Sequence, residues 1–241
     1  MPETVVSEKI TLDPRDTELV RAGVHFGYAK RRRHPQMRKF IAGVKNNIEI
    51  FQLEKVREHV DRALGFLEEQ GKQNSLVLWV GTKPAASKII AEVATALGHP
   101  YVNGRWLGGT LTNFKIIRDR VRYWQDLVSK QKSGELEKYT KQEQLRISKE
   151  IERLKRGLEG ILSLSELPKV MFVVDAGEEV IAVREARLKK ISVVALINSD
   201  CDPTSLSYAI PGNDNASKSV EFIVSKAKEA YLRGKKEHGG N

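Results

Sequence analysis

Three short apolar runs, each followed by a turn, constrain the fold of this chain more than any other feature. The runs are SLVLWV (75–80), VMFVV (170–174) and SVVALI (192–197). Continuous apolar runs of this length are typical of strands that are buried on both faces of a sheet. Helical patterns lie between them, and strands that alternate with helices form parallel sheets. The sequence therefore predicts an α/β domain with a doubly wound parallel sheet.

The helices around these strands are marked by apolar spacing and by breaker residues. In the helix that follows 75–80, Thr82 is the expected N-cap, Pro84 lies near the first helical position and Gly98 ends the helix after Leu97. The other helices are predicted at 55–70, 178–190 and 216–233, and further short strands at 48–53 and 101–102.

The segment 113–162 has a different period. Its apolar residues step by three and four along 114–128 and again along 147–161, with Ser133-Gly134 between them. A period of 3.5 is typical of coiled coils, and two such helices joined by a turn form an antiparallel hairpin. We expect 113–162 to be an arm inserted into a three-layer α/β domain. That domain would comprise 19–112 and 163–233, with flexible termini at 1–18 and 234–241.

The charge of the chain indicates a polyanionic partner. Lysine and arginine number 41 against 31 aspartates and glutamates, a net charge of +10. The single cysteine, Cys201, excludes an internal disulfide and fits a reducing compartment. We expect no membrane span, since the apolar runs are far shorter than the roughly 20 residues that a span needs. The first 20 residues have neither the apolar core of a signal peptide nor the arginine-rich character of a transit peptide.

The strongest local signal is a cationic segment at 30–45, which contains seven basic residues and no acid. Its KRRRHP sequence disfavours helix, so its guanidinium groups would project from a loop or an extended segment. Arginine forks match phosphate oxygens and stack on bases. The plainer alternative is a solvated basic loop. In such a loop seven positive charges would repel each other with no anion nearby, so we favour RNA or another polyanion as a binding partner.

Two further segments are candidates for contact with that partner. Lys83 lies in a strand-to-helix turn, where free N–H groups can hold an anion, although an ordinary capped turn is the preferred interpretation. In YVNGRWLGGTLTNF (101–114), Asn103 and Arg105 are the expected contact residues. Trp106 either stacks on a base or packs against the base of the arm, and packing is preferred.

An enzyme is the alternative of a different class. Asp175, Asp200 and Asp202 lie at or just beyond the ends of predicted strands, where open α/β sheets bind ligands. With Asp214 they could hold Mg²⁺ for phosphoryl transfer. The preferred interpretation is local, because Asp and Asn favour turns through hydrogen bonds to nearby backbone. No nucleotide-binding glycine motif is present, and the histidines and Cys201 lack metal-ligand spacing.

Seven segments of the sequence, in order along the chain, resemble the bacterial-type small-subunit ribosomal protein S2 family. The longest match, YVNGRWLGGTLTNFK at 101–115, is also the most specific. The others are AGVHFG (22–27), VGTK (80–83), LPKVMFVVD (167–175), EVIAVREAR (179–187), CDP (201–203) and IPGNDNA (210–216). The resemblance implies a flavodoxin-like sheet with an inserted antiparallel coiled coil.

The resemblance also implies a structural protein of translation, with no catalytic or metal site, no cofactor and no small-molecule substrate. It implies a cytoplasmic protein of the 30S subunit that binds 16S rRNA, supports assembly and contacts neighbouring proteins, including ribosomal protein S1. This chain departs from the family at Tyr28, where His is frequent, and at Asn198, where Asp is frequent. The expected RNA-binding residues are Lys30, Arg31, Arg32, Arg33, Arg38, Lys39, Lys83, Asn103, Arg105, Trp106 and Lys115.

Overall fold

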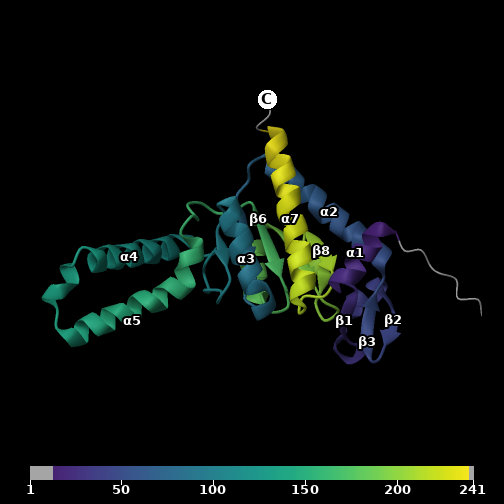
Figure 1. Ribbon diagram of the computed structural model, residues 1–241, viewed down its shortest axis with the longest axis horizontal. Coiled ribbons are helices and arrows are strands. Elements are labelled where there is room, and N and C mark those ends of the chain that lie inside the picture. The colour runs from purple at the N-terminus through teal and green to yellow at the C-terminus, as the bar shows by residue number, and fades with distance from the viewer. Residues whose placement is uncertain (1–12, 239–241) are drawn as a thin grey trace, which may run out of the picture.

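The computed structural model describes residues 13–238 as an α/β body with a small sheet at one end and a helical hairpin at the other (Figure 1). The strands of the body run parallel in the order β5-β4-β6-β7-β8. In chain order this is 2-1-3-4-5, the order of flavodoxin-like sheets. The predicted doubly wound sheet is confirmed. Its strands are β4 (Val77–Val80), β5 (Tyr101–Val102), β6 (Val170–Val174), β7 (Ser192–Ile197) and β8 (Tyr208–Pro211).

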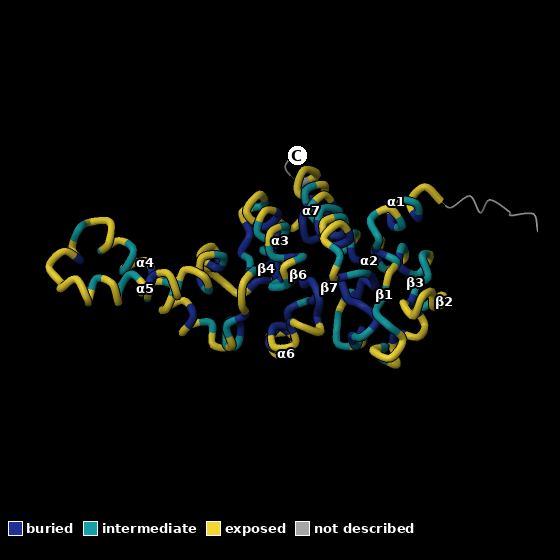
Figure 2. The backbone as a smooth tube through the Cα atoms, turned by 60° about the horizontal axis from the view of Figure 1, so that its bottom comes forward, coloured by how far each residue is buried: buried dark blue, intermediate teal, exposed yellow. Residues whose placement is uncertain are grey.

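Helices cover both faces of this sheet (Figure 2). Three of them, α2 (Leu53–Lys72), α3 (Pro84–Leu97) and α7 (Ser217–His238), lie on one face, and α6 (Val180–Leu188) lies on the other. All residues of β4 and β6 are buried, and the rings of Trp79 and Phe172 meet with centroids 4.9 Å apart. The apolar runs in the sequence therefore form the central strands of the core. No helix in the described part of the chain is long and apolar enough to cross a membrane.

A second, antiparallel sheet was only partly predicted. It has the order β1-β3-β2, with β1 (Phe26–Ala29), β2 (Ile41–Lys45) and β3 (Ile48–Phe51). The expected strand at 48–53 is β3, whereas β1 and β2 lie in segments for which no strand was expected. Asn46 and Asn47 both have positive φ and form the two-residue turn between β2 and β3.

The helical hairpin consists of α4 (Phe114–Lys132) and α5 (Lys141–Leu158), which contact each other. The helix α4 ends at the predicted break, where Gly134 takes the left-handed conformation with φ 78°. At the start of α5, Thr140 and Glu143 form a reciprocal capping box. The structure thus confirms two helices on either side of Ser133-Gly134.

Three local expectations differ from the structure. Thr82 does not cap α3, because Lys83 occupies the N-cap position and the Thr82 hydroxyl donates to Glu179. Residues 14–18 are helical in α1 (Pro14–Ala22), and 234–238 continue α7. The remainder of the expected flexible termini, 1–12 and 239–241, lies outside the described residues.

Close packing of α2 on α7 generates a stability prediction. A Cβ atom at Gly71 would collide with the carbonyl oxygen of Tyr231 in α7. Gly71→Ala should therefore lower the free energy of unfolding by about 1–3 kcal/mol. Gly65→Ala is the control, because Gly65 lies in the same helix with nothing within 4 Å of an added Cβ. This change should be neutral or stabilising by up to ~1 kcal/mol in urea denaturation. Equal losses in both variants would contradict the packing argument.

A buried histidine generates a pH prediction. Trp79 Nε1 donates to His99 Nδ1 over 3.3 Å, and burial lowers the His99 pKa to about 4, with a smaller contribution from the charge of Lys235. Between pH 6.5 and 4 the unfolded chain binds this proton and the folded chain does not, so stability falls on acidification. The loss is on the order of 3 kcal/mol. Denaturation of a His99→Gln variant across this pH window should show a shallower dependence, and an unchanged slope would refute this origin.

Candidate nucleic-acid interface

The crevice at the carboxyl end of the sheet, between β4 and β6, is filled by a side chain of the protein itself. In flavodoxin-like folds this switch point is where ligands bind. Here the Lys83 ammonium forms ion pairs with Asp175 and with Asp214, whose Oδ2 is 3.2 Å away, and it donates to Asn215 Oδ1 over 2.9 Å. The Lys83 side chain is only 17% exposed. Lys83, which was expected to contact a phosphate, therefore points into the protein and pairs with its own carboxylates.

The pKa values in this cluster follow from burial and charge. Burial opposes the charged form of Lys83, but the ion pairs with Asp175 and Asp214 outweigh it and raise the pKa of the ammonium. Burial, followed by the charge of Asp175, raises the pKa of Asp214 to about 6. The Lys83 ammonium therefore stays charged between two carboxylates, and burial disfavours the ionised form of one of them, Asp214.

The anion site considered at the turn before α3 is also occupied from within. The Thr82 backbone N–H donates to Glu179 Oε1 over 3.0 Å, and the Thr82 hydroxyl donates to the same oxygen. Glu179 is buried, and burial raises its pKa. An internal carboxylate takes the place that a phosphate would need, but the turn is also not the ordinary capped turn that was preferred, because Thr82 does not cap α3.

The acidic residues of the enzyme alternative are separately engaged. Asp175 Oδ1 accepts from the backbone of Gly177 at 2.9 Å, in addition to the Lys83 contact. Asp200 Oδ2 lies 2.7 Å from Arg32 Nη2, and Asp202 accepts from the backbone and the hydroxyl of Thr204. Within 13–238, no group of three or more His, Cys, Asp or Glu side chains is placed to hold a metal ion. The contacts support the local interpretation for Asp202 and for one oxygen of Asp175, whereas Asp200 and the other oxygen of Asp175 pair with Arg32 and Lys83, which are distant in the sequence.

The cationic segment is fastened to this same edge of the body. It forms two 3₁₀ turns, Lys30–Arg32 and Pro35–Phe40. The His34 N–H donates to the Ser199 carbonyl over 2.8 Å, and the Arg32 guanidinium lies 3.9 Å over the Tyr28 ring while it pairs with Asp200. The segment is thus a rigid surface and not a free loop.

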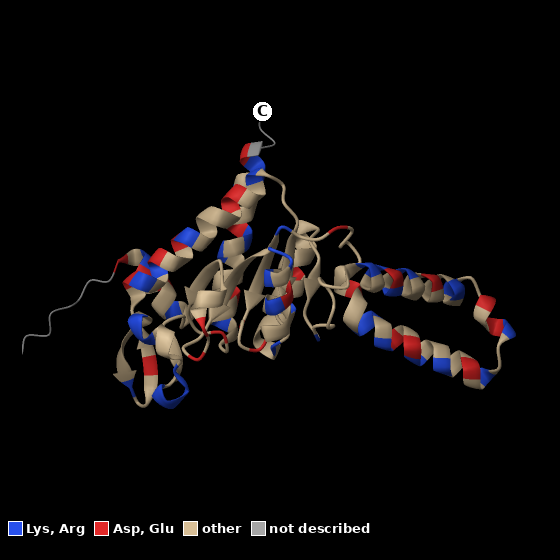
Figure 3. Ribbon diagram, turned by 180° about the vertical axis from the view of Figure 1, so that it is seen from behind, with Lys and Arg blue, Asp and Glu red and all other residues tan. Residues whose placement is uncertain are grey.

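Two of its arginines have carboxylate partners, Arg32 in the body at Asp200 and Arg33 in β3 of the small sheet at Glu49, and five cations remain exposed. Besides Arg32, Arg33 turns inward and lies 3.1 Å from Oε1 of the fully buried Glu49. The other basic residues of the segment are exposed and have no carboxylate partner among the described residues; we call them the outer cations. They are Lys30, Arg31, Arg38, Lys39 and Lys45. Figure 3 shows lysine and arginine gathered at this end of the molecule.

The loop before the arm is held by one buried carboxylate that sequence reasoning missed. Glu185 Oε1 accepts from Trp106 Nε1 at 3.0 Å and from the Gly109 N–H at 2.7 Å. Its Oε2 accepts from the Leu111 N–H and from both the N–H and the hydroxyl of Thr112. Burial disfavours the charge of Glu185, but these hydrogen bonds outweigh burial and lower its pKa. In the sequence this residue resembles any other charge on a helix face, and only the fold shows its partners.

The remaining candidates divide between inward and outward positions. Trp106 is buried, so the packing interpretation is confirmed and its ring is not available to stack on a base. The Asn103 amide donates to the Ser87 carbonyl at 3.3 Å and is half-buried. Arg105 and Lys115 are exposed, the latter in the first turn of α4.

Comparison with known proteins shows the family of the chain. The family model described as Ribosomal protein S2 matches residues 19–234. The chain is 43% identical over 218 residues to small ribosomal subunit protein uS2 of Thermus thermophilus, covering 90% of this chain and 85% of that protein. It is 40% identical over 222 residues to uS2 of Marinobacter nauticus, covering 92% and 89% respectively. The chain therefore belongs to the ribosomal protein S2 family, the members of which are structural, non-enzymatic proteins of the small ribosomal subunit.

Proposed function

We propose that the chain binds 16S rRNA in the small subunit mainly through the outer cations. One observation carries this proposal: within 13–238, the acids that pair with the cationic segment are those of Arg32 and Arg33, so the five outer cations face solvent without compensation. Phosphates supply the missing charge, and RNA helices are recognised largely through backbone and shape. Arg105 and Lys115 add exposed cations at the start of the arm, apart from the outer cations.

We infer that 113–162 acts as an inserted coiled-coil arm that widens the RNA contact, while the rest of the described chain forms one body. Among the apolar residues that recur every three or four positions along 114–128 and 147–161, four are buried in α4 and α5. They are Ile117, Trp124, Ile151 and Leu158. The arm begins directly after the loop that Glu185 fixes, so its direction is set by the body. Between 115 and 156 it has 13 basic and 7 acidic residues, which suits a phosphate-lined partner.

We also propose that the chain supports subunit assembly and the docking of ribosomal protein S1 beside other small-subunit proteins. Membership in the family supports this role, together with a fold that presents two separate surfaces, the small sheet and the arm (Figure 1). Contacts with several neighbours at once are consistent with a structural protein of a ribonucleoprotein.

The outer cations generate a prediction about salt dependence. With about 6–10 phosphate contacts, affinity for small-subunit rRNA should fall by roughly 10³–10⁵ between 50 and 200 mM salt. The double change Arg31→Gln/Arg38→Gln should weaken binding and reduce the slope of log K against log salt by about 1.4–1.8. The control is Lys88→Gln/Lys218→Gln, which removes the same charge from exposed positions on α3 and α7. Equal slopes for the two variants would exclude the outer cations as the RNA contact.

The arm generates a prediction about incorporation. Replacing 116–160 by a short Gly/Ser linker should leave binding to ribosomal particles detectable but weaker, because the outer cations lie on the body. Co-sedimentation with small-subunit particles, and the S1 content of those particles, measure the effect. Undiminished binding would show that the arm makes no contact, and complete loss in a folded variant would assign binding to the arm.

A further inference from the structure

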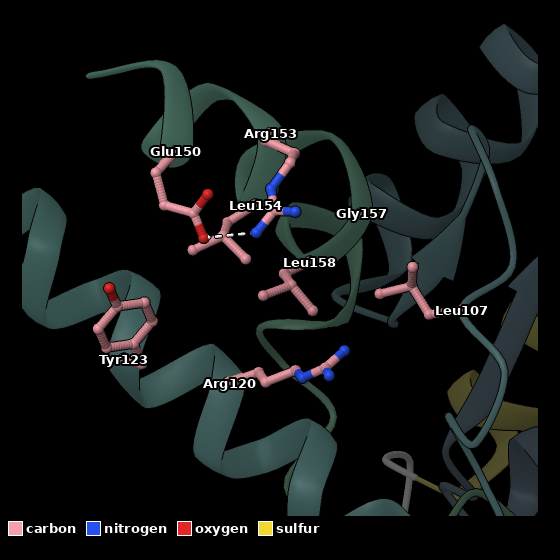
Figure 4. Close-up of a pocket in the computed structure, with 8 residues that line it drawn as sticks. All are labelled: Leu107, Arg120, Tyr123, Glu150, Arg153, Leu154, Gly157 and Leu158. Atoms are coloured by element: carbon pink, nitrogen blue, oxygen red, sulfur yellow. Dashed lines mark hydrogen bonds and ion pairs between the residues drawn. The ribbon is translucent and has the colours of Figure 1, made fainter. Parts of the chain in front are cut away.

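A pocket of about 330 Å³ lies where the arm leaves the body, between α4, α5 and the loop that precedes α4 (Figure 4). Its volume is in the range of small-ligand sites. No residue of the outer cations lines it, so it is separate from the surface described above. The lining residues are Leu107, Arg120, Tyr123, Glu150, Arg153, Leu154, Gly157 and Leu158.

The walls of the pocket combine an apolar floor with an aromatic ring. Figure 4 shows Leu154 and Leu158 projecting from α5 toward α4, and Leu107 closing the side next to the body. Tyr123 stands on the opposite side and is 52% exposed. A planar ligand could stack on the half-exposed ring and contact the apolar surface of the leucine side chains beside it.

The wall next to the body is fixed before any ligand arrives. Leu107 follows Trp106, whose indole is held by Glu185, and the hydrogen bonds of Gly109 and Leu111 to the same carboxylate hold the loop beyond it. Gly157 leaves room for this wall, because a Cβ there would lie 3.2 Å from Leu107 Cδ1. A preformed wall lowers the ordering cost of binding.

The charge around the pocket favours an anionic ligand. Glu150, the only acid in the lining, lies 2.7 Å from Arg153 Nη2 and is neutralised by it. Arg120 is exposed and has no ion pair with any described residue. Arg120 therefore leaves a positive charge in the lining.

We propose that this pocket binds one unpaired nucleotide of the rRNA, with its base stacked on Tyr123 over the leucines and its phosphate on Arg120. Aromatic side chains and arginine are the groups that hold splayed-out bases in RNA complexes. A protein side chain could use the apolar floor, but Arg120, which has no ion pair with a described residue, matches the phosphate of a nucleotide better. The inference rests on the proposed rRNA binding and names a site within it.

The test compares three variants in binding to deproteinised small-subunit rRNA. Tyr123→Ala should weaken binding about 5- to 150-fold, the usual effect of removing one stacked base, with the salt slope unchanged. Tyr123→Phe keeps the ring and should bind as the natural chain does. Tyr139→Ala removes another exposed tyrosine, 41% exposed, at the far end of the arm, and should also bind normally.

Base-specific chemical probing identifies the nucleotide. One unpaired base should be protected by the natural chain and by Tyr123→Phe, and it should become reactive with Tyr123→Ala, while the backbone footprint of the outer cations stays in place. Arg120→Gln should lower the salt slope by about one contact. If helicity of the Ala variant drops, Tyr123→Leu replaces it, since it keeps apolar bulk without a ring to stack.

The outcomes separate this proposal from the broader one. Normal affinity and unchanged base reactivity in Tyr123→Ala would overturn the nucleotide pocket and leave rRNA binding intact. Absence of any footprint with the natural chain would overturn rRNA binding itself. A cross-link from a photoreactive group at position 123 to a neighbouring protein, and not to RNA, in assembled subunits would assign the pocket to a protein partner and refute the proposal.

Discussion

The ion pairs of Lys83 with Asp175 and Asp214 are the contact on which the rest of the arrangement depends. The strand order 2-1-3-4-5 opens a crevice between β4 and β6, and three acidic or amide side chains converge there. Because the Lys83 ammonium fills the crevice, the crevice connects parts of the protein to each other and does not hold a ligand. Tyr28 joins the small sheet to it, because its hydroxyl accepts from Lys83 and from Asn215 Nδ2.

The chain uses its cations in two distinct ways. Arg32 pairs with Asp200 of the body and Arg33 with Glu49 of the small sheet, while the outer cations have no carboxylate partner among the described residues. The Arg32–Asp200 pair is partly exposed, and such pairs add modest stability, so its main effect is to set direction. Glu185 does the same for the loop before the arm with hydrogen bonds alone. The two regions proposed to face RNA therefore project from the same rigid sheet, one from each end.

Apolar runs and breaker residues were sufficient to predict the central strands, the helices that follow β3 and the break in the arm, but not α1. Strands β1, β2 and β8 were missed for physical reasons: four of the five residues of β2 are exposed, and β8 is four residues long and ends in proline. Composition located the outer cations, but it could not separate Arg33 or Lys83 from them. Their partners, Glu49 and Asp214, are brought near only by tertiary folding, as is Glu179, which takes the Thr82 hydroxyl away from α3.

Asn198 adds a neutral hydrogen-bond donor to the same crevice. Asn198 Nδ2 donates to Asp214 Oδ1 over 2.7 Å, and both residues are buried. One ammonium already faces two carboxylates there, and burial together with the charge of Asp175 raises the pKa of Asp214. An aspartate at 198 would bring a third carboxylate against a buried oxygen, where an unpaired charge costs far more than an amide. A neutral donor at this position is what lets Lys83 alone close the crevice.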